Sequence, residues 1–289
     1  LRGKIELLSS RFADLMLTEA ADPVSLLRDT VSESEPPTLA MEDFDHLEEP
    51  LEILRPYLRR TVDSRRKGVN VLIHGEPGTG KTQLARLLAK ELGCPLYEIA
   101  SEDAEGDPVT GEKRLRAFRA AQSFFAARPA LVLFDETEDV FNDGDGPGRR
   151  STAQKRKAWM NRMLESNPVP TLWLSNWVHG LDPAFVRRFD VVLEMSVPPR
   201  RKRERIIQAA CGDLVDARAS AMLASAKSLS PAVIARAASV AGTVRDLVPE
   251  DRLGRAVVSP VEGTLVAQGY RPLPGLDAAQ PPPEYDPGY

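Results

Sequence analysis

An eight-residue glycine-rich segment narrows the folds open to this chain more than any other part of its sequence. It follows an apolar run at 69–73, precedes a helical pattern at 83–90, and reads Gly75-Glu76-Pro77-Gly78-Thr79-Gly80-Lys81-Thr82. A strand, a glycine-rich turn and a helix N-terminus bring successive backbone N–H groups onto a polyphosphate. We therefore expect Lys81 to reach the β- and γ-phosphates and Thr82 to hold Mg²⁺, with Gln83 and the rest of the loop as nucleotide contacts. A turn that matches by chance is the alternative, which the flanking elements disfavour.

Length and composition indicate a soluble protein of about two domains. The chain has 289 residues, is 42% hydrophobic and contains no apolar stretch of the ~20 residues that span a bilayer. Its N-terminus shows no signal-peptide pattern, so we expect a cytoplasmic protein without a membrane segment. The net charge of −4 disfavours a chain built wholly for nucleic-acid binding. Because the chain begins at Leu1 and ends in proline-rich sequence, we expect it to be part of a longer protein.

The apolar pattern divides the chain into four parts. Residues 1–40 read as an amphipathic helical segment followed by a Ser/Glu/Pro-rich linker. Between 41 and 198, apolar runs alternate with helical patterns, which predicts an α/β fold with a five-stranded parallel sheet flanked by helices. Residues 199–258 read as a small all-helical domain, and 259–289 as a proline-rich, irregular tail. The expected strands are 69–73, 96–100, 130–134, 171–174 and 191–195.

Two carboxylates follow the third expected strand. Asp135 would hold Mg²⁺ directly or through water, because ligands in open α/β sheets gather at the carboxyl ends of the strands. Glu136 would polarise the attacking water as a general base. An apolar run that ends in Asp-Glu also occurs at solvated turns, but the phosphate loop upstream favours the catalytic interpretation.

The fourth expected strand ends at Asn176, and an arginine pair follows it. Asn176 could orient the attacking water or touch the γ-phosphate, or it could simply end a strand in a turn. Arg187 and Arg188 could reach a phosphate bound by a neighbouring subunit, or they could form a solvated basic turn. Their spacing leaves both alternatives open.

The chain resembles an AAA+ ATPase module over residues 42–250. The resemblance rests on five features that follow one another in this order: the phosphate loop, the Asp-Glu strand, the Asn-ended strand, the arginine pair and the helical lid. The resemblance implies a Walker A motif at 75–82, a Walker B pair at Asp135 and Glu136, and sensor 1 at Asn176. It implies that Arg187 and Arg188 act as fingers on the next subunit's ATP. ATP and Mg²⁺ are the implied cofactors, and a homo-oligomeric ring, expected to be a hexamer, is the implied assembly.

Two further segments receive roles from the same resemblance. Residues 41–47 resemble the segment that lies against the adenine, with His46 and Leu47 as its contacts. Residues 242–247 are similar to the sensor 2 pattern, in which an arginine, here Arg245, bends back to the γ-phosphate.

One stretch departs from the family pattern. Members that thread polypeptide through a central pore usually carry an aromatic-hydrophobic-Gly triplet after the second strand, whereas residues 101–111 contain no aromatic. This departure leaves three functions open. The first is an ATPase that remodels a protein partner, and the second is an ATP-dependent scaffold or assembly switch with slow hydrolysis. The third, a nucleic-acid loader or motor, depends on a basic cluster at 149–157, for which a solvated helix face is the alternative.

Overall fold

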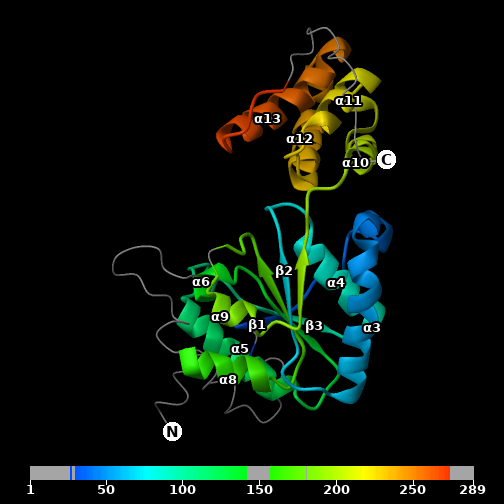
Figure 1. Ribbon diagram of the computed structural model, residues 1–289. Helices are drawn as coiled ribbons and strands as arrows, with labels where there is room; N and C mark the ends of the chain where they lie inside the picture. Colours follow the sequence, from blue (N-terminus) through cyan, green and yellow to red (C-terminus); the bar gives the residue numbers. More distant parts are fainter. Residues whose placement is uncertain (1–26, 28–29, 104, 142–156, 180, 274–289) are drawn as a thin grey trace, which may run out of the picture. The chain divides into compact units, whose positions relative to one another are not determined.

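The computed structural model describes residues 27, 30–103, 105–141, 157–179 and 181–273 (Figure 1). The chain divides into two compact units, Leu1–Ser196 and Val197–Tyr289. The expected N-terminal helix around residues 5–15 lies outside the described residues, and so does the basic cluster at 149–157 except for the backbone of Lys157. No described helix is long and apolar enough to cross a membrane.

The first unit is built on a six-stranded sheet with the order β1-β3-β4-β5-β2-β6. All five expected strands are present and parallel to one another. The sixth strand, β1, corrects the prediction of a linker, because it pairs antiparallel with β3 at the edge of the sheet. It is only three residues long and one of them is buried, too little for an alternating pattern to reveal it. The strands are β1 (Val31–Glu33), β2 (Asn70–His74), β3 (Leu96–Ile99), β4 (Leu131–Phe134), β5 (Thr171–Ser175) and β6 (Val191–Glu194).

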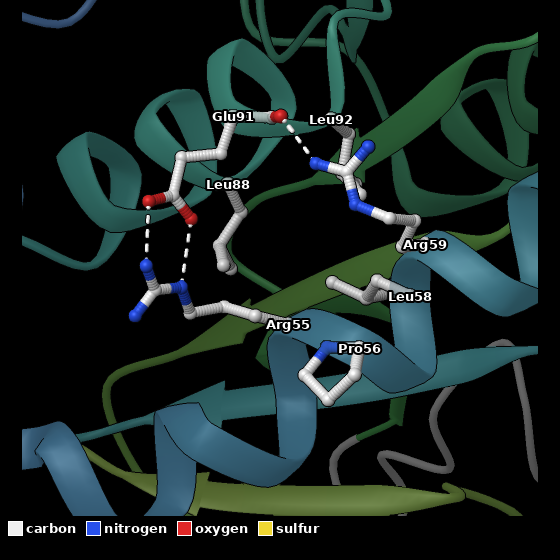
Figure 2. A pocket seen from close by; sticks show the side chains of 7 residues that line it. All are labelled: Arg55, Pro56, Leu58, Arg59, Leu88, Glu91 and Leu92. Atoms are coloured by element: carbon white, nitrogen blue, oxygen red, sulfur yellow. Dashed lines mark hydrogen bonds and ion pairs between the residues drawn. The ribbon is translucent and has the colours of Figure 1, made fainter.

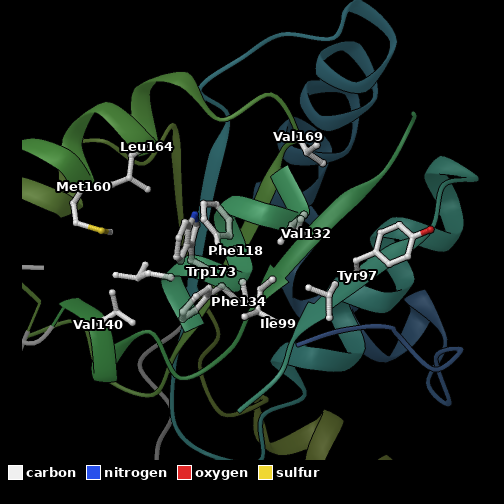
Figure 3. Close-up of a cluster of buried hydrophobic side chains, with 14 of the residues drawn as sticks. Tyr97, Ile99, Phe118, Val132, Phe134, Val140, Met160, Leu164, Val169 and Trp173 are labelled. Atoms are coloured by element: carbon white, nitrogen blue, oxygen red, sulfur yellow. The ribbon is translucent and has the colours of Figure 1, made fainter. Parts of the chain in front are cut away.

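The central strands are buried on both faces, and each face builds its own core. Along β5, Trp173 enters a core rich in aromatic side chains, while Leu172 and Leu174 enter a mainly aliphatic core on the opposite face. Figure 3 shows the aromatic core, where the rings of Phe118 and Phe134 each lie 5.0 Å from that of Trp173, measured between centroids. This alternation is what a parallel sheet covered by helices on both faces requires.

Helices cover the two faces of this sheet (Figure 1). Helices α3 and α4 lie over the aliphatic core, and Figure 2 shows the groove between them, about 340 Å³ in volume. There Arg55 donates two hydrogen bonds of 2.9 Å to the Glu91 carboxylate, at the end of α4 farthest from the phosphate loop. The short helix η2 also lies over the aliphatic core, and α5, α6, α8 and α9 cover the aromatic core. The elements of this unit are η2 (Met41–Leu47), α3 (Glu48–Ser64), α4 (Lys81–Leu92), α5 (Gly111–Phe125), α6 (Glu138–Phe141), α8 (Lys157–Ser166) and α9 (Pro183–Val186).

The second unit is helical, as expected, but its last helix extends beyond the predicted boundary at 258. Helix α13 runs from Leu253 to Ala267 and contains Pro260, so the predicted irregular tail cannot begin at 259. Proline inside a helix removes a backbone hydrogen bond, yet a stripe of buried apolar residues from Leu253 to Leu265 secures this helix. The elements are α10 (Arg200–Cys211), η3 (Gly212–Leu214), α11 (Ala217–Ser225), α12 (Pro231–Thr243), η4 (Arg245–Leu247), η5 (Glu250–Arg252) and α13.

Candidate active site

The phosphate loop joins β2 to α4 in a conformation that glycine permits. Gly80 precedes the first residue of α4 with φ 96°, and a Cβ there would lie 3.3 Å from the ring of Phe44. A Cβ on Gly75 would lie 2.1 Å from the carbonyl oxygen of Met195. The loop therefore brings the N-terminus of α4 to the carboxyl edge of the sheet, where the first turn of a helix offers its N–H groups to an anion.

Lys81 is buried and folds back over the loop. Its ammonium donates hydrogen bonds to the carbonyl oxygens of Gly75 at 2.7 Å and Glu76 at 3.1 Å, and to Asn176 Oδ1 at 2.9 Å. Burial lowers the pKa of Lys81, while the nearby carboxylates of Asp135 and Glu138 oppose that shift. The structure thus brings together two residues 95 positions apart that the sequence assigned separately to the γ-phosphate.

Thr82 and Asp135 meet where the magnesium site is expected. The Thr82 hydroxyl donates to Asp135 Oδ2 at 3.3 Å. Mg²⁺ in nucleotide sites is usually held by one or two protein oxygens, with phosphate oxygens and water completing the octahedron. A hydroxyl and a carboxylate suit that role, and a magnesium ion held there would neutralise charge on the phosphates. The described residues contain no cluster of three or more His, Cys, Asp or Glu side chains that could hold a metal.

Glu136 occupies an unusual backbone conformation. It is one of two described non-glycine residues with positive φ, at 51°, and its N–H donates to Asp135 Oδ1 at 2.7 Å. Partial burial of the carboxyl raises the pKa of Glu136, and the carboxylates of Asp135 and Asp139 raise it further. A glutamate with a raised pKa at a strained turn is typical of a catalytic base.

Asn176 is held in place by a residue that sequence reasoning missed. Its backbone N–H donates to the carboxylate of Glu138, at the start of α6. The neighbouring Thr137 donates from both its N–H and its hydroxyl to the Leu174 carbonyl, each at 3.0 Å. These contacts connect the turn after β4 to the end of β5, so Glu136 and Asn176 are fixed with respect to each other.

The segment before α3 packs against the phosphate loop. The Phe44 ring is buried beside Gly80, and Leu47 is buried in the aliphatic core. Gln83 was expected to contact nucleotide, and here its side-chain oxygen accepts the N–H of Thr38 at 2.8 Å. His46, the other expected adenine contact, has a side chain that is 8% exposed. The segment thus lies beside the site, and the adenine contacts stay a prediction.

The arginine pair lies at the opposite end of the sheet from the phosphate loop. Asp190, two residues after Arg188, accepts the N–H of Asn70 at 2.8 Å, and Asn70 begins β2 whereas His74 ends it. Arg187 is exposed. Arg188, by contrast, forms an ion pair of 3.2 Å with Glu165 and donates to the Ala184 carbonyl at 2.5 Å.

Arg245 belongs to the second unit. Its guanidinium donates to both oxygens of Asp213, at 3.1 and 2.5 Å, and both side chains are largely exposed. Its role as sensor 2 stays a prediction.

Arg114 is a second residue that sequence reasoning missed. Only 1% exposed, it lies on α5 and reaches the turn that carries Asp135 and Glu136. The available signal was its position, since Arg114 falls in line with the buried residues Phe118 and Phe125 of an amphipathic helix. A cleft of about 360 Å³ opens beside this turn, lined among others by Arg114, Glu136 and Glu102.

Comparison with known proteins shows which family part of the first unit matches. Residues 71–197 match the family described as "ATPase family associated with various cellular activities (AAA)". The chain contains an AAA+ ATPase module. It is 34% identical over 198 residues to the ATP-dependent zinc metalloprotease FtsH 3 of Sphaerobacter thermophilus, which is 62% of this chain and 39% of that protein. It is 32% identical over 146 residues to the ATPase family gene 2 protein homolog B of Bos taurus, 48% of this chain and 19% of that protein. The chain therefore spans less than half the length of these curated relatives.

Solved structures show the same fold as this AAA+ module. The FIGL-1 AAA domain in complex with ADP aligns with a TM-score of 0.59 and 18% identity, over 88% of this chain and 93% of that chain. A chain of the E. coli HORMA:CdnC:Trip13 complex aligns with a TM-score of 0.56 and 17% identity, over 78% of this chain and 93% of that chain. At these identities the similarity establishes the α/β architecture alone, and the predicted fold class is confirmed.

Proposed function

We propose that this chain binds Mg²⁺-ATP and hydrolyses it, within a homo-oligomeric ring, to drive conformational change in a protein partner. The observation that carries the proposal is the convergence of separate segments on one edge of the sheet. Lys81 reaches Asn176, and Thr82 reaches Asp135, so the phosphate, metal and γ-phosphate contacts assemble at one place. Glu136 follows Asp135 directly and supplies the base.

The position of the arginine pair supports a site shared between subunits. Strand β2 has five residues, so at about 3.3 Å per residue its two ends lie about 13 Å apart. Asp190 is hydrogen-bonded at one end of β2, and the phosphate loop begins at the other. Arg187 is thus poorly placed for the phosphate bound by its own subunit but exposed to a neighbour. A ring, with six subunits as the expected number, would supply that neighbour.

The decisive experiment replaces the general base. Glu136→Gln keeps the size of the side chain but removes its ability to accept a proton, so we expect turnover to fall by about 10²-fold or more while ATP still binds. Steady-state phosphate release and binding of a fluorescent ATP analogue measure the two properties. Glu52→Gln, the same change at an exposed carboxylate of α3, is the matched control and should bind and hydrolyse ATP as the wild type does. Wild-type turnover in Glu136→Gln would refute the assignment.

A second candidate is an ATP-dependent assembly switch with slow hydrolysis. It is favoured by the stretch 101–111, which has no aromatic residue where members that thread polypeptide carry one. In this chain the stretch folds onto itself, with Glu102 bridging Pro108 and Asp103 Oδ1 accepting the N–H of Asp107 at 2.9 Å. Turnover that is slow and unchanged by any protein partner, together with ATP-dependent assembly, would favour the switch.

A further inference from the structure

The guanidinium of Arg114 directs nearly all its described contacts at one turn. Nη2 donates to the carbonyl oxygen of Asp135 at 2.5 Å, and Nη1 donates to the carbonyl oxygen of Glu136 at 3.3 Å. Nη1 also pairs with Asp139 Oδ2 at 3.2 Å. The carbon of the guanidinium lies 4.4 Å from the centroid of the Phe134 ring, the residue that ends β4. One side chain from α5 thus touches the backbone of both carboxylate residues and the strand that leads into them.

These contacts surround the backbone of Glu136, which has a conformation that residues other than glycine rarely adopt. Glu136 has φ 51°, in the left-handed region that L-residues with a Cβ disfavour. The carbonyl groups of Asp135 and Glu136 flank that residue, and Arg114 accommodates both with one planar fork of donors. The backbone conformation fixes the direction of the Cα–Cβ bond of Glu136, so contacts that hold this backbone also fix where its side chain begins.

A purely structural role accounts poorly for a charge at this position. The Arg114 side chain is 1% exposed, so its charged form loses hydration there, and this burial lowers the pKa of Arg114. Its Nε has no hydrogen-bond partner among the described residues. An apolar side chain of similar length would pack α5 without that cost, because buried ion pairs seldom stabilise a fold more than apolar groups of similar volume. The contacts to the two carbonyl groups are what an apolar side chain would lose.

We propose that Arg114 is a positioning residue that holds the Asp135–Glu136 turn in the geometry needed for ATP hydrolysis. The proposal rests on the proposed function, in which Glu136 is the general base. It assigns Arg114 no contact with the nucleotide. Its loss should therefore slow the chemical step while the phosphate loop continues to bind ATP.

The test compares Arg114→Met with a matched substitution on the same helix. Gln122 is also buried on α5, and its side chain hydrogen-bonds to the backbone of Val169, at the end of the helix away from the turn. We expect Arg114→Met to lower kcat by about 10- to 100-fold, since misplacing a catalytic group costs this much, with KM and ATP affinity changed less than about threefold. Arg114→Lys, which retains the charge, should recover part of kcat. Gln122→Met should lower the melting temperature and leave kcat near wild type.

Glu136→Gln distinguishes a positioning role from a general loss of structure. Because Arg114 acts through Glu136, the double variant Arg114→Met/Glu136→Gln should hydrolyse ATP no more slowly than Glu136→Gln alone.

The outcomes separate the two proposals. Equal losses of kcat in Arg114→Met and Gln122→Met at matched melting temperature would overturn the positioning role, as would a further loss in the double variant. Should Arg114→Met not fold, Arg114→Lys takes its place, because it keeps the charge but loses the two-pronged guanidinium that contacts both carbonyl groups. A several-fold loss of kcat at unchanged ATP affinity supports the proposal, and wild-type kcat overturns it. Wild-type turnover in Glu136→Gln would instead refute the proposed function itself.

Discussion

At the scale of single residues, the environment of Glu136 sets how hydrolysis should respond to acid. Burial and neighbouring carboxylates raise its pKa. A general base works only when ionised, so activity is lost as pH falls through that pKa. We expect the acid limb of kcat to lie above the value of an ordinary glutamate, about 4.3. Phosphate release measured across pH, with folding checked by circular dichroism at each point, tests this. A limb at or below 4.3 would contradict it.

The residues of the site that could be predicted are those whose chemistry is local in sequence. Lys81 and Thr82 are recognisable because a glycine-rich turn between a strand and a helix has one common use. Glu138 was not recognisable, and for Arg114 the sequence offered only its place on the buried face of α5. The reason is that each acts on a backbone group more than 20 positions away. The packing of α5 and α6 against the sheet is what brings both side chains to these backbone groups.

At the scale of elements, the two arginines after α9 should contribute unequally. Arg187 is exposed, whereas Arg188 is tied to Glu165 and Ala184. We expect Arg187→Ala to cut turnover by about 10³-fold with ATP binding nearly intact, as loss of an arginine finger does. Arg188→Ala should reduce turnover less.

Glu165→Gln serves as the matched control for this comparison. It weakens the ion pair to Arg188 without changing either arginine. If Arg188 mainly supports the loop, Glu165→Gln should reproduce part of the Arg188→Ala loss in turnover. Equal thousandfold losses in both arginine variants, with Glu165→Gln at the wild-type rate, would show instead that both arginines reach the phosphate.

Sequence patterns predicted elements well where burial is regular and poorly where it is not. Strands β2 and β5 are long enough, and buried enough, to stand out as apolar runs. Strand β1 is too short to do so, and it is held by backbone pairing to β3. Helix α13 was cut short in the prediction at Pro260, because a local breaker was given more weight than the buried stripe on either side.

At the scale of the whole molecule, a site shared between subunits predicts complementation. Lys81→Met should not bind ATP but keeps Arg187, whereas Arg187→Ala keeps the phosphate loop. Mixed rings would contain interfaces that join the intact halves of the two variants. We expect mixtures to hydrolyse ATP faster than the sum of the separate variants, measured over a series of mixing ratios. Mixtures that never exceed that sum, although size-exclusion chromatography shows mixed oligomers, would argue for sites complete within one subunit.

Strand β2 is the feature whose consequence reaches farthest. Its last residue, His74, leads into the phosphate loop. The N–H of its first residue, Asn70, donates to the carboxylate of Asp190, which follows the arginine pair. In a ring assembled as proposed, each β2 strand would connect the phosphate loop of its own subunit to the arginine pair that serves the ATP of the next subunit. A displacement of the loop on nucleotide release would push directly on the arginines that serve the adjoining site. The order in which subunits hydrolyse ATP would then depend on a strand about 13 Å long.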